Sequence, residues 1–445
     1  MATTYLSYTQ ATPTNNKKWT WSAWCKLAPG SEQYVMSAYT DANNNTSIRF
    51  LGTDGRLDFQ NYVSSSDAGR LKTTRHLRDP GAWYHIVCIF DSDNVTSGDR
   101  QQIWINGVRE TDFDTETYPS SGAASILNAS GIVAELGRRS DSSDMFAGEM
   151  AHVHFCDGQA YTPSTFGETD ATSGIWIAKT SPSVTYGDNG YFMKFASGAT
   201  GTDSSGESNN MTVSGTMTNL KDNPDNNFCT GNPLDNYYQQ SNFSNGNNTV
   251  EITQPGGNHG YCSSTMGVAA GLWYFEAKPT TGTDRAVGFV DIPQPDSSEN
   301  MGQGGTGSTF CFRHNGQSKQ GGSSSAYGSA YSTDDIIGVY LDLTANKAYF
   351  AINGTIQNSG TGLAITAAAS TTTGFYKPGA DSTNGSDTTW QFNFGNGYFG
   401  TTAVTSGVAD AGGEGTFEYN PSTGTFDGSS KDFRAICTNN IATYG

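Results

Sequence analysis

Apolar and polar residues alternate over short stretches along most of this chain, and Gly, Asn, Asp or Ser interrupt those stretches. A period of two places every second side chain on the same face of an extended strand. Few stretches carry the 3.6-residue period of an amphipathic helix. The pattern therefore predicts an all-β protein built from many short strands.

Particular segments make this prediction specific. In KKWTWSAWCKL, the alternation places Trp19, Trp21, Ala23 and Cys25 on one face of a strand. The segment AWYHIVCIFDSD is apolar without interruption, so we expect a central strand that is covered on both faces. GIVAELGRR and MFAGEMAHVHFCDGQAYTPSTFG are expected to supply further strands of the same sandwich.

Three pairs of residues mark tight turns between such strands, namely Asp54-Gly55, Asn106-Gly107 and Asn353-Gly354. Glycine supplies the positive φ that a two-residue hairpin turn requires. The similar phrases QIWINGVRE and AYFAINGTIQ reflect this shared requirement, since the residues that flank them differ.

His152 and His154 are two residues apart, so we expect both imidazoles on one face of a strand. We interpret them as paired surface or half-buried imidazoles. A metal site would need a third ligand, which the sequence does not place.

The composition divides the chain near residue 200, where SGATGTDSSGESNNMTVSG is polar and rich in glycine. We predict a first sandwich over residues 1–220, an ordered linker over 221–248, a second sandwich over 249–402 and a C-terminal extension over 403–445. The linker is expected to lie against the domains through Phe228, Leu234, Tyr237 and Tyr238. The extension is expected to add little to a core and to lie over a neighbouring domain or subunit.

The net charge of -18 at pH 7 opposes binding to phosphate backbones, so nucleic acid is excluded as a partner. The seven cysteines form no C-x-x-C pair and mostly lie in apolar runs, which indicates buried, reduced thiols of a protein made in the cytosol. The first residues, MATTYLSYTQ, lack the pattern of a standard signal peptide, and no run of 18 apolar residues predicts a membrane span.

The first half resembles a known family. The succession SAW, WYHIVCIFD, IWINGVRE, AELGRR and FAGEMAHVHFCDGQAYTPSTFG resembles the laminin-G-like branch of the concanavalin A-like lectin/glucanase superfamily. This resemblance covers roughly the first two hundred residues and implies a jelly-roll sandwich of two antiparallel sheets.

The second half is similar to a SPRY domain in the succession WYFE, VGFVD, IGVYLDLTANKAYFAING and FNFG. That resemblance implies a bent antiparallel sandwich used for binding. Between VGFVD and IGV the chain departs from the family pattern with a long Gly/Ser-rich segment, which puts a family-type partner loop in doubt.

FCTGNPL at Phe228 and ICTNNIA at Ile436 share the phrase C-T-x-N. DNPDNNFCTGNPLDN and KDFRAICTNNI look like segments of structural proteins of marine bacteriophages. The resemblance implies a virion protein that is synthesised in the host cytoplasm and contacts other virion proteins.

Catalytic motifs were sought and not found. Glucanases of the concanavalin A-like superfamily place paired carboxylates in an E-x-D-x-x-E spacing, which this chain lacks. It also lacks G-x-S-x-G and H-E-x-x-H, and GQGGTGS has no lysine of a phosphate loop. We therefore expect no enzyme and no cofactor, with a calcium ion held by oxygen ligands left open.

Two Asn- and Asp-rich loops have the residue types that bind sugars, and turn chemistry alone also explains such loops. The candidate carbohydrate-binding residues are Asp41, Asn43, Asn45, Arg138, Arg139, Asp141 and Asp144.

The function that we predict is a fibre, spike or decoration on the virion surface that adheres to host-surface glycans, without membrane insertion. A homo-oligomer is expected, with a trimer as first choice. The alternatives are a purely architectural capsid or tail decoration and a glycoside hydrolase.

Overall fold

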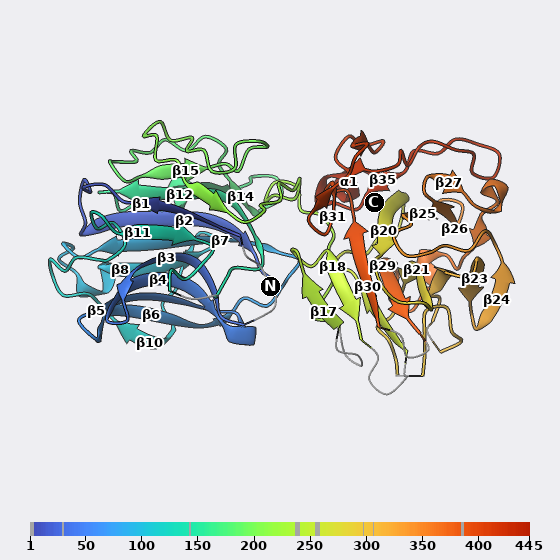
Figure 1. The fold of residues 1–445 in the computed structure, drawn as a ribbon, viewed down its shortest axis with the longest axis horizontal. Coiled ribbons are helices and arrows are strands. Elements are labelled where there is room, and N and C mark those ends of the chain that lie inside the picture. Colours follow the sequence, from blue (N-terminus) through green and yellow to red (C-terminus); the bar gives the residue numbers. More distant parts are fainter. Residues whose placement is uncertain are drawn as a thin grey trace. The chain divides into compact units, whose positions relative to one another are not determined.

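The computed structural model describes residues 4–28, 31–141, 144–235, 241–253, 259–296, 298–305, 307–383 and 387–445, without the side chain of Thr53. The chain divides into two compact units, Met1–Asn219 and Leu220–Gly445. Each unit contains two large, mainly antiparallel sheets (Figure 1). The prediction of an all-β protein with two sandwiches in tandem is confirmed.

The first unit packs an eight-stranded sheet against a six-stranded sheet. The spatial order of the larger sheet is β10 (Phe113–Thr117), β6 (Ser66–His76), β5 (Arg56–Val63), β4 (Asn44–Leu51), β3 (Gln33–Asp41), β11 (Val133–Leu136), β1 (Tyr5–Thr9) and β16 (Thr212–Ser214). The order of the smaller sheet is β15 (Tyr191–Met193), β12 (Glu149–Asp157), β2 (Lys18–Lys26), β7 (Trp83–Asp91), β8 (Gln101–Ile105) and β9 (Val108–Arg109).

The core of this unit follows the predicted alternation. Trp19, Trp21, Ala23 and Cys25 of β2 all lie in the core between the sheets, whereas Trp24 packs on the opposite face. Strand β7 is central, between β2 and β8, and both of its faces are covered as expected. The alternating pattern of the sequence therefore identified the inward face correctly.

The outer face of the six-stranded sheet is covered by the segment that contains η3 (Pro163–Thr165), β13 (Gly167–Thr169) and β14 (Trp176–Ala178). His152 and His154 both contact the ring of Phe192 on this face, with centroids 6.2 and 3.9 Å apart, although β12 bulges at His152 with a φ of 49°. The predicted shared face is confirmed. The description of His154 as surface or half-buried is wrong, because its side chain is fully covered.

A third imidazole, His85, belongs to the same layer. Its Nδ1 accepts a hydrogen bond from Trp176 Nε1 at 3.0 Å, so Nε2 carries the proton that is donated to Ser22 Oγ at 2.9 Å. His154 Nδ1 bonds the hydroxyl of Tyr186 at 2.9 Å. These imidazoles therefore bond the covering layer and the neighbouring strand.

The three predicted turns are present. Asn106 and Gly107 have φ values of 49° and 79°, and Asn353 and Gly354 have values of 47° and 77°. Gly55, with φ of 69°, follows the short helix η1 (Gly52–Asp54) between β4 and β5. Both Asn-Gly pairs adopt the left-handed backbone for which Asn and Gly are suited, whereas at Asp54-Gly55 only the glycine does, because Asp54 belongs to η1 and the turn is longer than the predicted two residues.

The second unit packs a nine-stranded sheet against a six-stranded one. The path of the first is β17 (Ser241–Ser244), β18 (Thr249–Ile252), β30 (Thr388–Asn393), β20 (Leu272–Pro279), β25 (Ile337–Asp342), β26 (Lys347–Ile352) and β27 (Thr355–Ile356), with β28 (Leu363–Ala364) on β26 and β35 (Arg434–Ala435) on β20. The order of the second is β19 (Gly260–Ser263), β29 (Lys377–Ser382), β21 (Arg285–Val290), β22 (Phe310–Arg313), β23 (Gln317–Gln320) and β24 (Ser323–Ala326). The remaining elements are η2 (Ser97–Asp99), η5 (Asn358–Gly360), η6 (Ala368–Ser370), β31 (Tyr398–Phe399), β32 (Thr402–Ala403), β33 (Val408–Ala409), β34 (Thr416–Phe417) and α1 (Thr438–Tyr444).

The segment expected to be a linker contributes β17 to this sheet, and Phe228 is buried. Leu234 does not anchor the segment, because 63% of it is exposed, and Tyr237 and Tyr238 lie outside the described residues. The two C-T-x-N segments lie side by side, since the backbone N–H of Cys229 donates to the carbonyl of Ile436 at 3.0 Å.

The C-terminal extension packs on the outer face of the nine-stranded sheet. Phe417, Phe426 and Phe433 are fully buried there against Tyr340 and Tyr349. The expectation that this segment adds little to a core is therefore wrong, because three aromatic side chains spaced along it complete a second apolar layer.

All seven cysteines are buried and none is in a disulfide, as predicted. Within the described part of the chain, no helix has the length and apolarity needed to cross a membrane.

Candidate functional site

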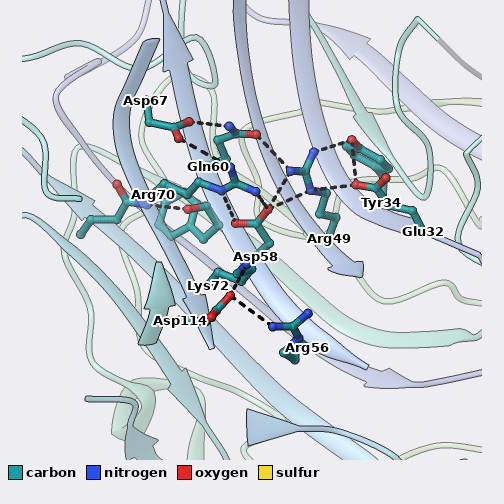
Figure 2. Close-up of polar contacts among 12 residues, drawn as sticks. Glu32, Tyr34, Arg49, Arg56, Asp58, Gln60, Asp67, Arg70, Lys72 and Asp114 are labelled. Atoms are coloured by element: carbon teal, nitrogen blue, oxygen red, sulfur yellow. Dashed lines mark hydrogen bonds and ion pairs between the residues drawn. The ribbon is translucent and has the colours of Figure 1, made fainter. Parts of the chain in front are cut away.

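The outer face of the eight-stranded sheet in the first unit carries polar and aromatic side chains, which we call the polar face. Ile48, Phe59 and Leu71 point into the core, so the residues that alternate with them on β4, β5 and β6 point outward. Part of this face is drawn in Figure 2. The polar face comprises Tyr34, Ser37, Tyr39, Asn45, Ser47, Arg49, Asp58, Gln60, Tyr62, Asp67 and Arg70.

Asp58 is the centre of the polar face (Figure 2). Its side chain is fully buried and accepts hydrogen bonds from Arg49 Nε and Nη2 at 3.1 and 2.7 Å, and from Arg70 Nε and Nη2 at 3.0 and 2.9 Å. Burial disfavours the charge on Arg49, but the Asp58 carboxylate outweighs it and raises the pKa of Arg49. Charge-assisted bonds of this kind fix both guanidinium groups.

The network continues outward from the two arginines. Arg49 Nη1 donates to the Tyr34 hydroxyl at 2.6 Å, and its Nε lies 3.0 Å from Glu32 Oε1. Gln60 accepts from Arg49 at 3.2 Å and donates to Asp67 Oδ1 at 2.5 Å. These bonds hold the side chains of four neighbouring residues in one arrangement.

Two tyrosines flank an asparagine on adjacent strands of this face. Tyr39 of β3 lies opposite Asn45 of β4, which lies opposite Tyr62 of β5. All three side chains are partly exposed. Two aromatic rings with an amide between them offer apolar surface, hydrogen-bond donors and acceptors at one place.

The loop around Arg139 and Asp141 folds over β3 beside this row. Arg139 Nε lies 2.6 Å from Asp141 Oδ1, and its guanidinium carbon is 5.6 Å from the ring centroid of Tyr34. Asp141 also accepts a hydrogen bond from Tyr39, whose pKa is raised by partial desolvation and then by that carboxylate. Asp144 lies 3.9 Å from Arg139 Nη1.

Arg138 is committed elsewhere. It forms two hydrogen bonds to Glu135, at 2.8 and 2.6 Å, and its guanidinium carbon is 3.8 Å from the ring centroid of Tyr5. Its contacts fix the start of the loop to β11 and β1.

Asp41 and Asn43 form the turn between β3 and β4. Asp41 Oδ1 accepts the backbone N–H of Asn43 at 2.7 Å, and Asn43 Oδ1 accepts the Ser65 hydroxyl at 2.8 Å. Of the seven candidate residues, Asn45 belongs to the polar face, and Arg139, Asp141 and Asp144 lie in the loop beside it. Arg138 is bound to Glu135, and Asp41 and Asn43 form a turn.

The sequence reasoning missed most of the polar face, although a signal was present. In the hairpin SIRFLGTDGRLDFQNYV, Arg49 and Asp58 each stand between two apolar residues, and Gln60 and Tyr62 follow Asp58 at every second position. The same alternation that identified the core therefore marks these side chains as neighbours on the outer face.

In the ranges that the structure describes, no group of three or more His, Cys, Asp and Glu side chains is arranged to hold a metal ion.

Comparison with protein families finds a match within each unit. Residues 1–165 match the family described as the concanavalin A-like lectin/glucanases superfamily, and residues 272–376 match the SPRY domain. The chain has a concanavalin A-like domain and a SPRY domain. The two resemblances seen in the sequence are thus confirmed at the level of domains. No match was found among curated proteins.

Solved structures resemble single domains of the chain. The SPRY domain of human HERC1 shares 16% identity, with 36% of this chain and 96% of that one covered at a TM-score of 0.30. A heptameric SAP-like pentraxin from Limulus polyphemus shares 17% identity, with coverages of 41% and 89% and a TM-score of 0.29. A protein from Bacteroides ovatus described as a putative carbohydrate binding protein shares 15% identity, with coverages of 48% and 56% and a TM-score of 0.29.

Proposed function

We propose that the concanavalin A-like domain binds glycans through the polar face, and that the chain is a non-catalytic protein displayed on the surface of a bacteriophage particle. The observation that carries the glycan proposal is the row of Tyr39, Asn45 and Tyr62 on adjacent strands. A lectin-like fold fits carbohydrate binding, but the fold alone does not specify a ligand.

The row has the chemistry that a sugar ring requires. The faces of Tyr39 and Tyr62 offer apolar surface for sugar C–H groups, and the Asn45 amide both donates and accepts hydrogen bonds to hydroxyls. Asp141 adds an acceptor beside Tyr39. The strands hold these groups in place before a ligand arrives, which lowers the entropic cost of binding.

The ion pairs of the face support binding rather than catalysis. A glycosidase needs one protonated and one ionised carboxyl group that flank the glycosidic bond. Asp58 is held between two guanidinium groups, and Asp141 is paired with Arg139. Both carboxylates are thus occupied by ion pairs with guanidinium groups and are not free to flank a glycosidic bond.

The phage setting rests on the resemblance of the two C-T-x-N segments to structural proteins of bacteriophages. These segments pair with each other inside the second unit. Adhesion to host-surface glycans is the role that fits both a virion surface and the polar face. A homo-oligomer would present several copies of the polar face, so that weak binding of each copy to glycans gives a higher avidity.

A glycan array probed with the full chain tests the proposal. Wild-type protein is expected to retain a defined set of glycans, and the double variant Tyr39→Ala/Tyr62→Ala is expected to lose them by at least about tenfold, because stacking surface is removed. Tyr444→Ala, which removes an exposed tyrosine from α1 in the second unit, is the matched control and should leave binding unchanged.

Other outcomes would contradict the proposal. Unchanged binding by the double variant would place the site elsewhere, and cleavage of a retained polysaccharide would identify a hydrolase. An oligomer that attaches to particles and retains no glycan would favour the architectural alternative.

A further inference from the structure

The SPRY domain buries a lysine on the outer side of its six-stranded sheet. Lys319 extends from β23 over a small apolar cluster that includes Met301 and Cys311, and only 7% of the residue is exposed. Lysine is seldom buried to this degree unless its ammonium group is paired.

The ammonium group contacts two carboxamides. Lys319 Nζ lies 2.5 Å from Asn300 Oδ1 and also contacts Gln303 Oε1. Asn300 is itself 9% exposed, so the Lys319–Asn300 pair is shielded from solvent. A buried amine held against a carboxamide has the two functional groups of a transamidation reaction in contact.

A buried acid lies beside the pair. Asp381 of β29 is 2% exposed, and its Oδ2 accepts the backbone N–H of Met301, the residue after Asn300, at 3.2 Å. Its Oδ1 is buried and, among the described residues, has no hydrogen-bond partner. The backbone N–H of Ala286 also acts on this carboxyl group, so main-chain donors of two neighbouring segments hold it in place.

The environment favours the protonation states that the reaction needs. Burial lowers the pKa of Lys319 and raises the pKa of Asp381 to about 7. Cys311, Arg313 and Glu299 are further titratable groups that act on Lys319. The two shifts act toward a protonated Asp381 and toward a neutral, nucleophilic amine on Lys319.

We propose that Lys319 and Asn300 form an intramolecular isopeptide bond, with Asp381 as the proton carrier. The lone pair of neutral Nζ attacks Cγ of Asn300, while Asp381 donates its proton to the oxygen that becomes the oxyanion. A proton then passes from Nζ to Nδ2, the Cγ–Nδ2 bond breaks and ammonia leaves. Asp381 regains its proton as the carbonyl re-forms, so no oxidant or co-reactant is consumed.

Asn300 is the acceptor rather than Gln303 for two reasons. The Asp381 carboxyl group binds the backbone next to Asn300 and so holds the acid near that carboxamide. Gln303 is only half-buried, whereas Asn300 is buried, and exclusion of water protects a neutral amine.

The bond would tie the segment 298–305 covalently to β23. The cysteines of this chain are all unpaired, so a disulfide does not supply such a tie. An amide link resists reduction and closes a short ring of residues 300–319, which restricts the unfolded chain.

Mass spectrometry of the full purified chain tests the proposal. Intact protein is expected to be lighter than its sequence mass by one ammonia molecule. Trypsin should then release a branched peptide in which residues 286–313 are joined to residues 314–347, because amidated Lys319 is no longer a cleavage site. An unmodified sequence mass for the wild-type chain would overturn the proposal.

Variants locate the bond and the acid. Lys319→Arg and Asn300→Ala should each have the intact mass calculated from the variant's own sequence, and trypsin should release only linear peptides from them. Asp381→Asn should also show no loss of ammonia. Lys278→Arg, which changes a lysine paired with exposed Asp334, is the control and should retain the branched peptide.

Three results would contradict these assignments. Ammonia loss confined to a linear peptide would indicate a succinimide at an asparagine, and a branch at Gln303 would exclude Asn300. A branched peptide in Asp381→Asn would exclude Asp381 as the proton carrier. The mass of the wild-type chain tests whether the isopeptide bond exists. The proposal can therefore be refuted even if a variant fails to fold.

Discussion

At the scale of single residues, Asp58 both stabilises the first domain and positions the arginine side chains of the polar face. Its carboxylate has no exposed surface, yet it neutralises two guanidinium groups that reach the surface of the polar face. Removal of one member of a buried charge network costs more than the network contributes, because the remaining charges lose their partner. Asp58 therefore controls both the stability of the first domain and the shape of its outer face.

The substitution Asp58→Ala is expected to lower the free energy of unfolding of the concanavalin A-like domain by about 1–3 kcal/mol. Urea unfolding followed by tryptophan fluorescence measures it, since of the eight tryptophans only Trp273 and Trp390 lie in the SPRY domain. Asp114→Ala, which removes an exposed carboxylate paired with Lys72, should change the unfolding much less. Equal losses in the two variants would contradict the central role of Asp58.

At the scale of elements, the turn between β8 and β9 does more than reverse the chain. A Cβ at Gly107 would lie 2.8 Å from the ring of Trp176, so the turn packs directly beneath β14. Trp176 in turn bonds His85 of β7. The glycine thus satisfies a left-handed turn and leaves room for the covering layer at the same position.

Two alanine substitutions separate these requirements. Gly131→Ala places alanine at a φ of 78° with no atom within 4 Å, and is expected to destabilise the domain by about 1–2 kcal/mol through backbone strain alone. Gly107→Ala, at a φ of 79°, adds the clash with Trp176 and should cost about 1–3 kcal/mol more. Thermal unfolding of both variants measures the difference, and equal effects would show that the Trp176 contact is unimportant.

At the scale of the whole molecule, the most deeply buried imidazoles lie in one domain and the carboxyl groups with the largest pKa shifts lie in the other. Burial lowers the pKa of His85 to about 3 and the pKa of His154 well below its ordinary value in the concanavalin A-like domain. Burial raises the pKa of Glu276 and of Asp381 to about 7 in the SPRY domain. The domains should therefore respond to acid in opposite directions.

The signs follow from proton binding. Below an ordinary pKa of 6.5 the unfolded chain protonates His85 and His154 while the folded domain does not, so stability is lost as pH falls. For His85 the loss at pH 5 is about 2 kcal/mol, and His154 acts in the same direction. Glu276 and Asp381 keep protons in the folded SPRY domain that the unfolded chain releases above about pH 4. Their contribution to stability is full below that pH and is lost as pH rises through 7.

Hydrogen exchange of the full chain at pH 7 and pH 5, corrected for the intrinsic rate, measures both responses. Acidification is expected to weaken protection in β2 and β7 of the first domain and to maintain or strengthen it in β20 and β30 of the second. A fall of similar size in both domains would indicate that general charge repulsion, rather than these buried groups, governs the response.

The sequence alone predicted the local features for physical reasons that are themselves local. Alternation around Trp19 and Trp21 identified the core face because side chains of a strand point to opposite sides. Asn106-Gly107 and Asn353-Gly354 identified turns because few other residues tolerate a positive φ at both positions. The order of motifs also indicated both domain families.

The candidate site was predicted only in part. The loop with Arg139 and Asp141 was named from its composition, but its position over Tyr39 was not, since that contact joins residues about a hundred positions apart. The third imidazole, His85, was missed for the same reason. The burial of Phe417, Phe426 and Phe433 was missed because these aromatics are spaced without a strand or helix period.

The sequence by itself determined which segments become strands, where they turn and which side chains face inward, because each property depends on a few consecutive residues. Only the tertiary structure decided that Tyr39 lies beside Asn45 and Tyr62, and that Lys319 meets Asn300 near Asp381. Strand order and the path of a covering loop are set by packing across the whole domain. Contacts between distant residues therefore follow from the fold, and the proposed binding and cross-linking chemistry depends on such contacts.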